Sequence, residues 1–268
     1  MTTLALMLGG FGCSKLPSEP EFDNPIIPDD PSFVPPKVTL VSCPSEGAVL
    51  NTCHVELVWR GNQPDMEFTY QLDIGEWSAW ADDTTLTCPW LDEGTHDFQV
   101  KGRYASGIET DSAAAVSFVV NDIQGPALWL SPRHQEIDQD STFTVEVMLE
   151  EVENIFALKA VLEFDPTKLQ VSQIEVYEDT RSLLKANGGT VIPFDRYDNS
   201  TGTATIEVAT ATGNPPGVSG TGAIAQLTFT AIGGGNSQIS NTTASILRDP
   251  DNQSITINEL VDAAVEVR

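Results

Sequence analysis

The fold class of the second half of the chain follows from the stretch Asn154-Ile-Phe-Ala-Leu-Lys-Ala-Val-Leu-Glu-Phe-Asp-Pro-Thr-Lys-Leu169. From Phe156 to Phe164 every second position is apolar, and the positions between them are mixed. This period of two is typical of a strand with one buried face. An Asp-Pro pair then ends the run, and a second alternating run begins at Leu169. The stretch therefore predicts two successive strands joined by a tight turn.

Strand patterns continue on both sides of this stretch. Residues 122–268 offer nine strand candidates, namely 127–131, 142–149, 155–164, 169–176, 190–195, 203–210, 222–232, 243–247 and 261–267. Residues 177–187 form the one segment whose pattern allows a short helix. Several candidates have one apolar face, and two sheets can bury such faces against each other. The sequence thus predicts a nine-stranded jelly-roll sandwich over residues 122–268.

The order of these strands resembles that of the cohesin family. The resemblance rests on three motifs: the turn Phe164-Asp-Pro-Thr-Lys-Leu169, the strand Gly202-Thr-Ala-Thr-Ile-Glu-Val-Ala209 and the run Val218-Ser-Gly-Thr-Gly-Ala-Ile-Ala-Gln-Leu-Thr-Phe229. In the third motif, small residues permit close backbone packing ahead of a buried strand. Cohesins bind dockerins in cellulosome-like assemblies. The resemblance implies a non-catalytic module that binds a dockerin-like partner protein, as a scaffold in polysaccharide breakdown.

The resemblance also implies which residues bind the partner. In cohesins of the best-known type, the dockerin lies on a sheet face that includes the opening strand and its neighbour. The outward positions of these two strands are Ala157, Lys159, Val161, Glu163, Thr205, Glu207 and Ala209. Many members carry Asn and Asp where this chain has Ala157 and Lys159, and replacing an acid by a lysine reverses the charge pairing that sets specificity. Ordinary solvated positions on a sheet surface are the alternative interpretation.

Residues 37–121 show a second set of short, evenly spaced strand candidates, at 38–41, 53–59, 68–73, 84–88, 96–104 and 115–120. This spacing predicts a first β-sandwich of the immunoglobulin or fibronectin type III kind. The segment resembles fibronectin type III-like modules of bacterial surface proteins, in which a tryptophan on the second strand fills the core. Trp59 stands at that position. The alternative is a sugar-binding platform built from Trp59, Trp77, Trp80 and Trp90.

Three cysteines lie in this first domain, so at most one disulfide can join two of them. Cys43 and Cys53 bracket a predicted turn and are the expected pair. The alternatives are a Cys53–Cys88 disulfide and three free thiols. A Cys-x-x-Cys spacing is absent from the sequence, so neither a zinc site nor thiol exchange is predicted.

The N-terminal residues resemble an export signal. Residues 1–13 are apolar and end in Gly-Cys, like the end of a bacterial lipoprotein signal in which Cys13 would become lipidated. Residues 14–36 are rich in proline and acid, which predicts a disordered tether. The two segments together predict an exported lipoprotein, anchored in the membrane at the bacterial cell surface or in the periplasm. A disordered or buried N-terminal segment is the alternative.

Charge narrows the choice of partners. Thirteen Lys and Arg against 39 Asp and Glu give a formal net charge of −26. Nucleic acids and anionic membrane surfaces repel such a protein, so a membrane is expected as a partner only through the lipid anchor.

Enzyme chemistry is not indicated. The three histidines are scattered and no Gly-x-Ser-x-Gly motif is present, so we predict no catalytic residues and no cofactor. Turns at 195–199 and 249–252 carry oxygen ligands that suit calcium, but they lack the spacing of a defined calcium loop, and no metal is predicted.

Glycan binding is the competing function, because cellulose-binding modules resemble cohesins in fold. Such modules need a row of exposed aromatic rings. The second domain offers few candidates for that row, namely Trp129, Tyr177 and Tyr197. The sequence therefore favours a protein partner over a polysaccharide.

Overall fold

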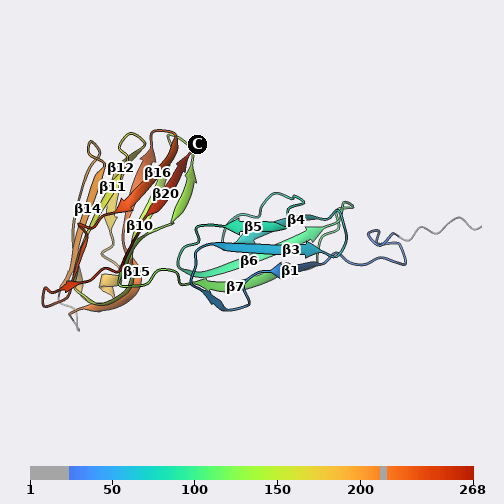
Figure 1. Ribbon diagram of the computed structural model, residues 1–268, viewed down its shortest axis with the longest axis horizontal. Coiled ribbons are helices and arrows are strands. Elements are labelled where there is room, and N and C mark those ends of the chain that lie inside the picture. The colour runs from blue at the N-terminus through green and yellow to red at the C-terminus, as the bar shows by residue number, and fades with distance from the viewer. Residues whose placement is uncertain (1–23, 212–215) are drawn as a thin grey trace, which may run out of the picture.

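The buried side chains form two large cores, one in each half of the sequence, and a third, small cluster of Ile123, Ala127 and Trp129. Strands surround both large cores (Figure 1). The computed structural model describes residues 24–211 and 216–268. The predicted all-β class is confirmed, since the helical content of these residues is a single 3-10 turn, η1 (Leu183–Lys185). Residues 1–13 with Cys13, and the start of the predicted tether, lie outside the described residues. Within the described ranges, no helix is long and apolar enough to cross a membrane.

The first core lies between a sheet of three strands and a sheet of four. The three-stranded sheet has the order β1 (Val38–Ser42), β3 (Val55–Gly61), β5 (Thr85–Cys88). The four-stranded sheet has the order β2 (Ala48–Leu50), β7 (Ala114–Val120), β6 (Gly94–Arg103), β4 (Glu67–Leu72). Trp59 is 1% exposed, and its ring centroid lies 5.6 Å from that of Phe98 and 5.7 Å from that of Tyr70. Trp59 therefore fills this core, and the kinship of the domain with fibronectin type III modules stays a prediction.

Residues 24–36 do not extend as the predicted disordered tether. They form a looped segment that closes on itself, because the Val34 N–H donates a hydrogen bond of 2.9 Å to the Pro25 carbonyl. The Tyr104 hydroxyl donates to the Val34 carbonyl at 2.8 Å, and Ile26 and Phe33 pack against the first core. The prediction is wrong for this part of the segment, because apolar side chains among the prolines give it buried surface to pack.

The second core lies between two larger sheets. One sheet has the order β12 (Leu169–Val176), β15 (Val218–Ala231), β10 (Thr142–Ile155), β8 (Ala127–Ser131), β19 (Glu259–Val261). The other has the order β13 (Thr190–Asp198), β14 (Thr203–Ala211), β11 (Ala157–Phe164), β16 (Gly235–Asn241), β20 (Ala263–Val267), β9 (His134–Ile137), and β17 (Ile246–Arg248) pairs with β11 and with β18 (Ser254–Ile255). The sandwich thus has more strands than the nine predicted, and the segment 177–187, where the sequence allowed a short helix, contains the 3-10 turn η1.

Strand β11 has the buried face that its sequence predicted. Every second residue from Leu158 to Phe164 belongs to the second core, whereas the alternate residues of the strand lie on the outer face. The Asp165 carbonyl accepts hydrogen bonds from the N–H groups of Lys168 and Leu169, which closes the tight turn into β12. Most neighbouring strands are antiparallel, but β19 pairs with β8, and β20 with β9, in parallel. The last strands therefore lie beside the first strands of the domain.

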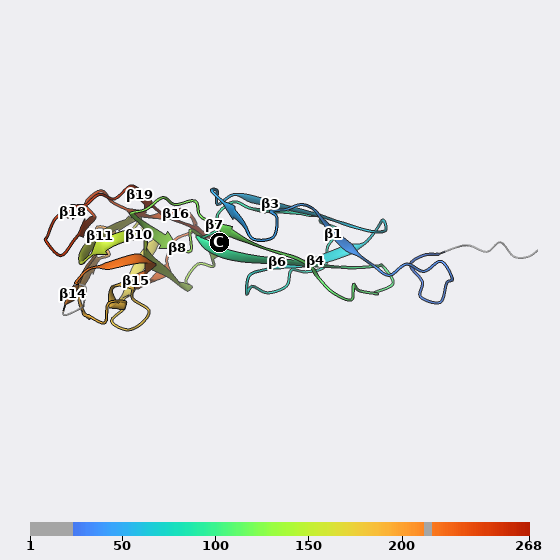
Figure 2. The same ribbon diagram turned by 90° about the horizontal axis from the view of Figure 1, so that it is seen from below.

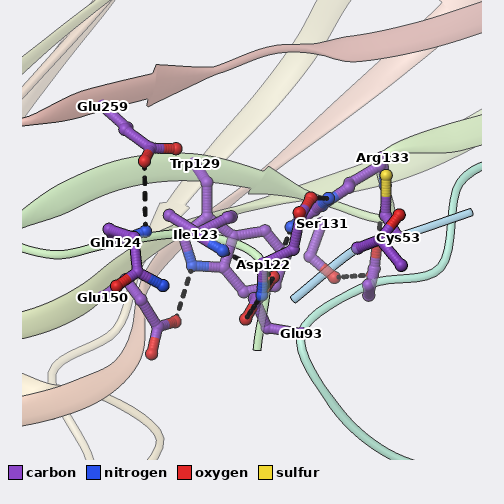
Figure 3. A network of polar contacts seen from close by, with 12 residues as sticks. Cys53, Glu93, Asp122, Ile123, Gln124, Trp129, Ser131, Arg133, Glu150 and Glu259 are labelled. Carbon is purple, nitrogen blue, oxygen red and sulfur yellow. Dashed lines mark hydrogen bonds and ion pairs between the residues drawn. The ribbon is translucent and has the colours of Figure 1, made fainter. Parts of the chain in front are cut away.

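The two sandwiches lie end to end and meet at a junction around Arg133 (Figures 2 and 3). The Arg133 guanidinium donates to Glu93 at 2.5 Å and to Asp122 at 2.9 Å, and the Arg133 backbone N–H donates to Asp92 at 2.8 Å. The side chains of Arg133 and Glu93 are 4% and 7% exposed. A buried charge is tolerated when paired charges and hydrogen bonds surround it. These contacts fix the first sandwich against the second.

A second acid lies close to the junction. Glu150 accepts hydrogen bonds from the Trp129 indole N–H at 3.2 Å and from the Thr221 hydroxyl at 2.6 Å (Figure 3). Burial raises the pKa of Glu150 and also that of Glu93. Both carboxyl groups therefore lie where their charged forms are disfavoured relative to water.

Candidate partner-binding face

The predicted partner-binding residues belong to β11 and β14, the two inner strands of an outer face formed by four adjoining strands in the order β17, β11, β14 and β13. Residues directly opposite each other on neighbouring strands point to the same side of a sheet. The strand registers therefore arrange the outward side chains in rows that cross the sheet. Each row is displaced by two residues from the previous one, which corresponds to about 6.6 Å along the strands.

We call four of these rows together the docking face. The first row contains Arg248, Ala157, Ala209 and Ile192, and the second contains Ile246, Lys159, Glu207 and Phe194. The third contains Val161, Thr205 and Arg196, and the fourth contains Ser240, Glu163, Thr203 and Asp198. The docking face thus brings all seven predicted residues together and adds residues of β13 and β17 that the sequence analysis did not name.

The first two rows of the docking face are largely apolar and surround a hollow of about 380 Å³. Three large apolar side chains on its rim are exposed: Ile192 by 56%, Phe194 by 55% and Ile246 by 37%. Apolar side chains that gather at the surface around a hollow are typical of a contact site for another molecule. This end of the docking face can therefore bury apolar surface against a partner.

Cations flank the hollow. Lys159 lies directly opposite Ile246 in the second row, and Arg248 lies opposite Ala157 in the first. The Arg248 guanidinium donates to the Asn252 carbonyl at 3.2 Å. Arg196 in the third row lies with its guanidinium 5.9 Å from the centroid of the Phe194 ring. Among the described residues, these three cations form no ion pair with an acidic side chain.

The opposite end of the docking face is polar and acidic. Glu163 is exposed in the fourth row, and Asp198 accepts hydrogen bonds from the hydroxyl and the N–H of Ser200. The bond from the Ser200 hydroxyl lowers the pKa of Asp198, so this carboxylate is charged at neutral pH. The docking face therefore changes from apolar and cationic to polar and anionic along the strands.

One predicted contact residue is not accessible. Thr205 is 8% exposed, because it lies in the third row between Val161 and Arg196, whose longer side chains flank it. Of the seven predicted residues, the other six are half-buried or exposed. The prediction that Thr205 offers its side chain to a partner is wrong for this reason.

The predicted disulfide is not formed, and Cys43, Cys53 and Cys88 are free thiols. Ser42 lies opposite Val58 in the antiparallel β1–β3 pair, which places Cys43 beside Leu57, about four residues, or roughly 13 Å, along the sheet from Cys53. A disulfide needs Cα atoms within about 7 Å. The segment between the two cysteines is not a tight turn, because its strand β2 crosses to the other sheet and pairs with β7.

Cys88 is excluded from thiol chemistry by its surroundings. Its side chain is buried in the first core, and this burial raises the pKa of Cys88 to about 11. The thiol is therefore protonated at neutral pH, and a protonated thiol is a poor nucleophile and metal ligand.

The two turns considered for calcium use their side chains for turn formation. Asp249 accepts a hydrogen bond from the Gln253 N–H, as Asp198 does from Ser200. Within residues 24–211 and 216–268, no three His, Cys, Asp or Glu side chains are grouped as metal ligands would be.

The three aromatic residues considered for glycan binding do not form a row of exposed rings. Trp129 is 3% and Tyr177 is 2% exposed, whereas Tyr197 is 43% exposed. In the first domain Trp59 is buried. The Lys101 ammonium lies over the Trp77 ring, and the Arg103 guanidinium lies over the Trp80 ring. Such rings offer a sugar no continuous surface for stacking.

Comparison with known proteins supports the resemblance. A family model described as the cohesin domain matches residues 132–267. No curated protein matches the chain. Among solved structures, the chain is similar to a non-cellulosomal cohesin from the hyperthermophilic archaeon Archaeoglobus fulgidus, with 14% identity, a TM-score of 0.42 and coverage of 53% of this chain and 90% of that chain.

Two further structures are similar at the same level. One is the sixth cohesin of scaffoldin B from Acetivibrio cellulolyticus in complex with a mutant Cel5 dockerin, with 17% identity, a TM-score of 0.43 and coverage of 54% of this chain and 100% of that chain. The other is the Coh-OlpA–Doc918 complex from Clostridium thermocellum, with 15% identity, a TM-score of 0.43 and coverage of 53% of this chain and 98% of that chain. The cohesin domain is a non-catalytic protein-binding module, which confirms the prediction against an enzyme. Because the matched segment makes up just over half of its length, the chain belongs to the cohesin domain family.

Proposed function

We propose that the chain is a non-catalytic adaptor that holds a dockerin-like protein module on its docking face. The observation that carries the proposal is the group of exposed apolar side chains, Ile192, Phe194 and Ile246, on the face to which the family resemblance assigns the partner. Their burial supplies free energy for association, and the charged residues beside them supply selectivity.

The proposed place of this adaptor is the outside of a bacterial cell. Cohesins are typically extracellular or cell-surface modules. We propose that Cys13 is lipidated and that the chain contributes to a scaffold in polysaccharide breakdown. The first sandwich lies between residue 24 and the second sandwich, so it would act as a spacer that holds the docking face away from an anchor (Figure 1).

Lipidation is tested separately from binding. Metabolic labelling with a radioactive or clickable palmitate analogue should mark the wild-type chain, and Cys13→Ser should lose the label and leave the membrane fraction. Labelling that persists in Cys13→Ser would contradict the proposed anchor and would leave the proposal of a protein partner unaffected.

Binding is tested with a panel of dockerin modules, recognised by their duplicated calcium loops, from the organism that encodes this chain. Calorimetry in calcium buffer should find a module that binds the full chain, and Phe194→Asp should weaken that binding about 100-fold by placing a charge in the contact. Val41→Asp is the matched control, because Val41 is 58% exposed in the first domain. Equal binding by wild type and Phe194→Asp would contradict the proposal. Retention of the chain on insoluble polysaccharide, with no module bound, would favour the glycan alternative.

A further inference from the structure

We propose that the partner of the docking face is an amphipathic helix that presents an acidic side chain to Lys159 and Arg248. The inference rests on the proposed function, and it names the chemistry that selects among helical partners. The observation behind it is the placement of cations in a strongly acidic chain.

Acids outnumber cations in this chain, with 39 Asp and Glu against 13 Lys and Arg, and four of the twelve cations in the described ranges form an ion pair with an acidic side chain. Arg103, Arg133 and Arg181, for example, each form an ion pair. Lys159 and Arg248 are among the described cations that form no ion pair, and what sets them apart is their place, because both are half-buried and both line the apolar hollow. These two positive charges are available to a partner.

The neighbourhood of the hollow is positive. Its lining contains the two cations Lys159 and Arg248 and one acid, Glu207, which lies directly opposite Lys159 on β14. Arg196 adds a third cation in the row beyond. A locally positive surface on a chain of net charge −26 favours a carboxylate on the partner and disfavours a lysine or an arginine there.

A helix fits the spacing of the rows. Side chains one turn apart on a helix are separated by about 5.4–6 Å along its axis, close to the roughly 6.6 Å between rows of the docking face. A helix lying along the strands can therefore place an apolar side chain in the hollow and an acidic one, three or four positions away, beside Lys159 or Arg248. Glu163 in the fourth row repels an acid at the far end, which fixes the direction of the helix.

The test uses a display library of one dockerin-type helical module whose exposed helix positions are randomised, selected against the full chain. Wild type should enrich clones with Asp or Glu next to the apolar contact positions. Lys159→Glu with Arg248→Glu should enrich Lys or Arg at the same positions, and should weaken an acid-bearing clone about 100-fold. The control is Lys37→Glu with Arg60→Glu, which makes the same charge change at exposed sites of the first domain and should alter binding less than about threefold.

The outcomes separate this inference from the proposed function. Clones that lose binding with Phe194→Asp but show no preference for acids would overturn the inference and leave the docking face in place. A library that yields no clone sensitive to Phe194→Asp would overturn both. Clones weakened equally by the two double variants would show that only net charge matters, which also overturns the inference.

Discussion

Cations have opposite roles at the junction and on the docking face. At the junction, Arg133 is buried, and Glu93 and Asp122 neutralise its charge. On the docking face, Lys159 and Arg248 are half-buried and no acid of the described chain pairs with them. A buried charge must be compensated inside the fold, whereas a surface cation keeps its water until a partner replaces it. Arg133 therefore holds the two sandwiches together, whereas Lys159 and Arg248 are available for recognition.

The same substitution at Arg133 and at Lys159 should affect stability very differently. Arg133→Met should lower the free energy of unfolding by about 3 kcal/mol, because it leaves Glu93 buried without its cation. Lys159→Met should change it by less than about 0.5 kcal/mol, because that side chain has no ion pair to lose. Calorimetric unfolding measures both. An equal loss of unfolding free energy in Arg133→Met and Lys159→Met would contradict the different roles of the two cations.

Arg133→Met should also loosen the two sandwiches relative to each other, which small-angle scattering would detect as a broader range of overall shapes. Lys159→Met should leave the scattering curve unchanged. An unchanged scattering curve for Arg133→Met would show that other contacts, such as the stacked Trp90 and His134 rings, suffice to fix the junction.

The next prediction concerns an apolar residue of the docking face. Ile192→Ser should weaken partner binding about tenfold, since about half of this side chain would be removed from water by the partner. Its effect on unfolding should stay below about 0.5 kcal/mol, because the side chain is exposed in the free chain. Ile74→Ser in the first domain is the matched control, measured by calorimetry alongside it. Loss of stability in Ile192→Ser would assign this residue to the fold and not to recognition.

The smallest expected effect is a pH dependence that belongs to the junction. Burial raises the folded-state pKa of Glu150, so the folded chain binds more protons than the unfolded chain between the ordinary glutamate pKa and the raised value. This contribution to stability is present at acidic pH and is lost as the pH rises through the raised pKa. Glu150→Gln should flatten that slope, because an amide does not titrate in this pH range. The variant can keep both contacts, since its amide oxygen can accept from Trp129 and its amide N–H can donate to Thr221. An unchanged slope in unfolding measured from pH 4 to 7 would contradict the assignment.

Strands with a local signal could be predicted from the sequence. The alternation of apolar residues located β11 and its buried face, and β12 begins and ends where its pattern predicted, at Leu169 and Val176. Trp59 alternates in phase with Val55 and Leu57, and all three side chains are buried in the first core. Each of these features depends on neighbours within a few residues, which a single sequence displays.

The docking face could be predicted only in part, because half of it depends on which distant strands become neighbours. Ile192 and Phe194 give β13 an apolar outer side, a pattern visible in the sequence, yet only the register with Ala209 and Glu207 places them beside the predicted residues. Arg248 reaches the face because β17 pairs with β11 across a long separation in sequence. The junction around Arg133 likewise joins residues from both domains, and no local pattern indicates such contacts.

The parallel pairs that close the second sandwich have a mechanical consequence. If tension acts between the first sandwich and the Val267 end of β20, strands β9 and β20 are pulled past each other along their length, because they run in the same direction. The hydrogen bonds of such a pair then resist together, whereas those of an antiparallel hairpin such as β13–β14 open one after another. Single-molecule pulling from the first domain and residue 267 should therefore require a higher unfolding force than pulling from residues 190 and 211. A chain that must hold a partner under drag would benefit from this direction of strength.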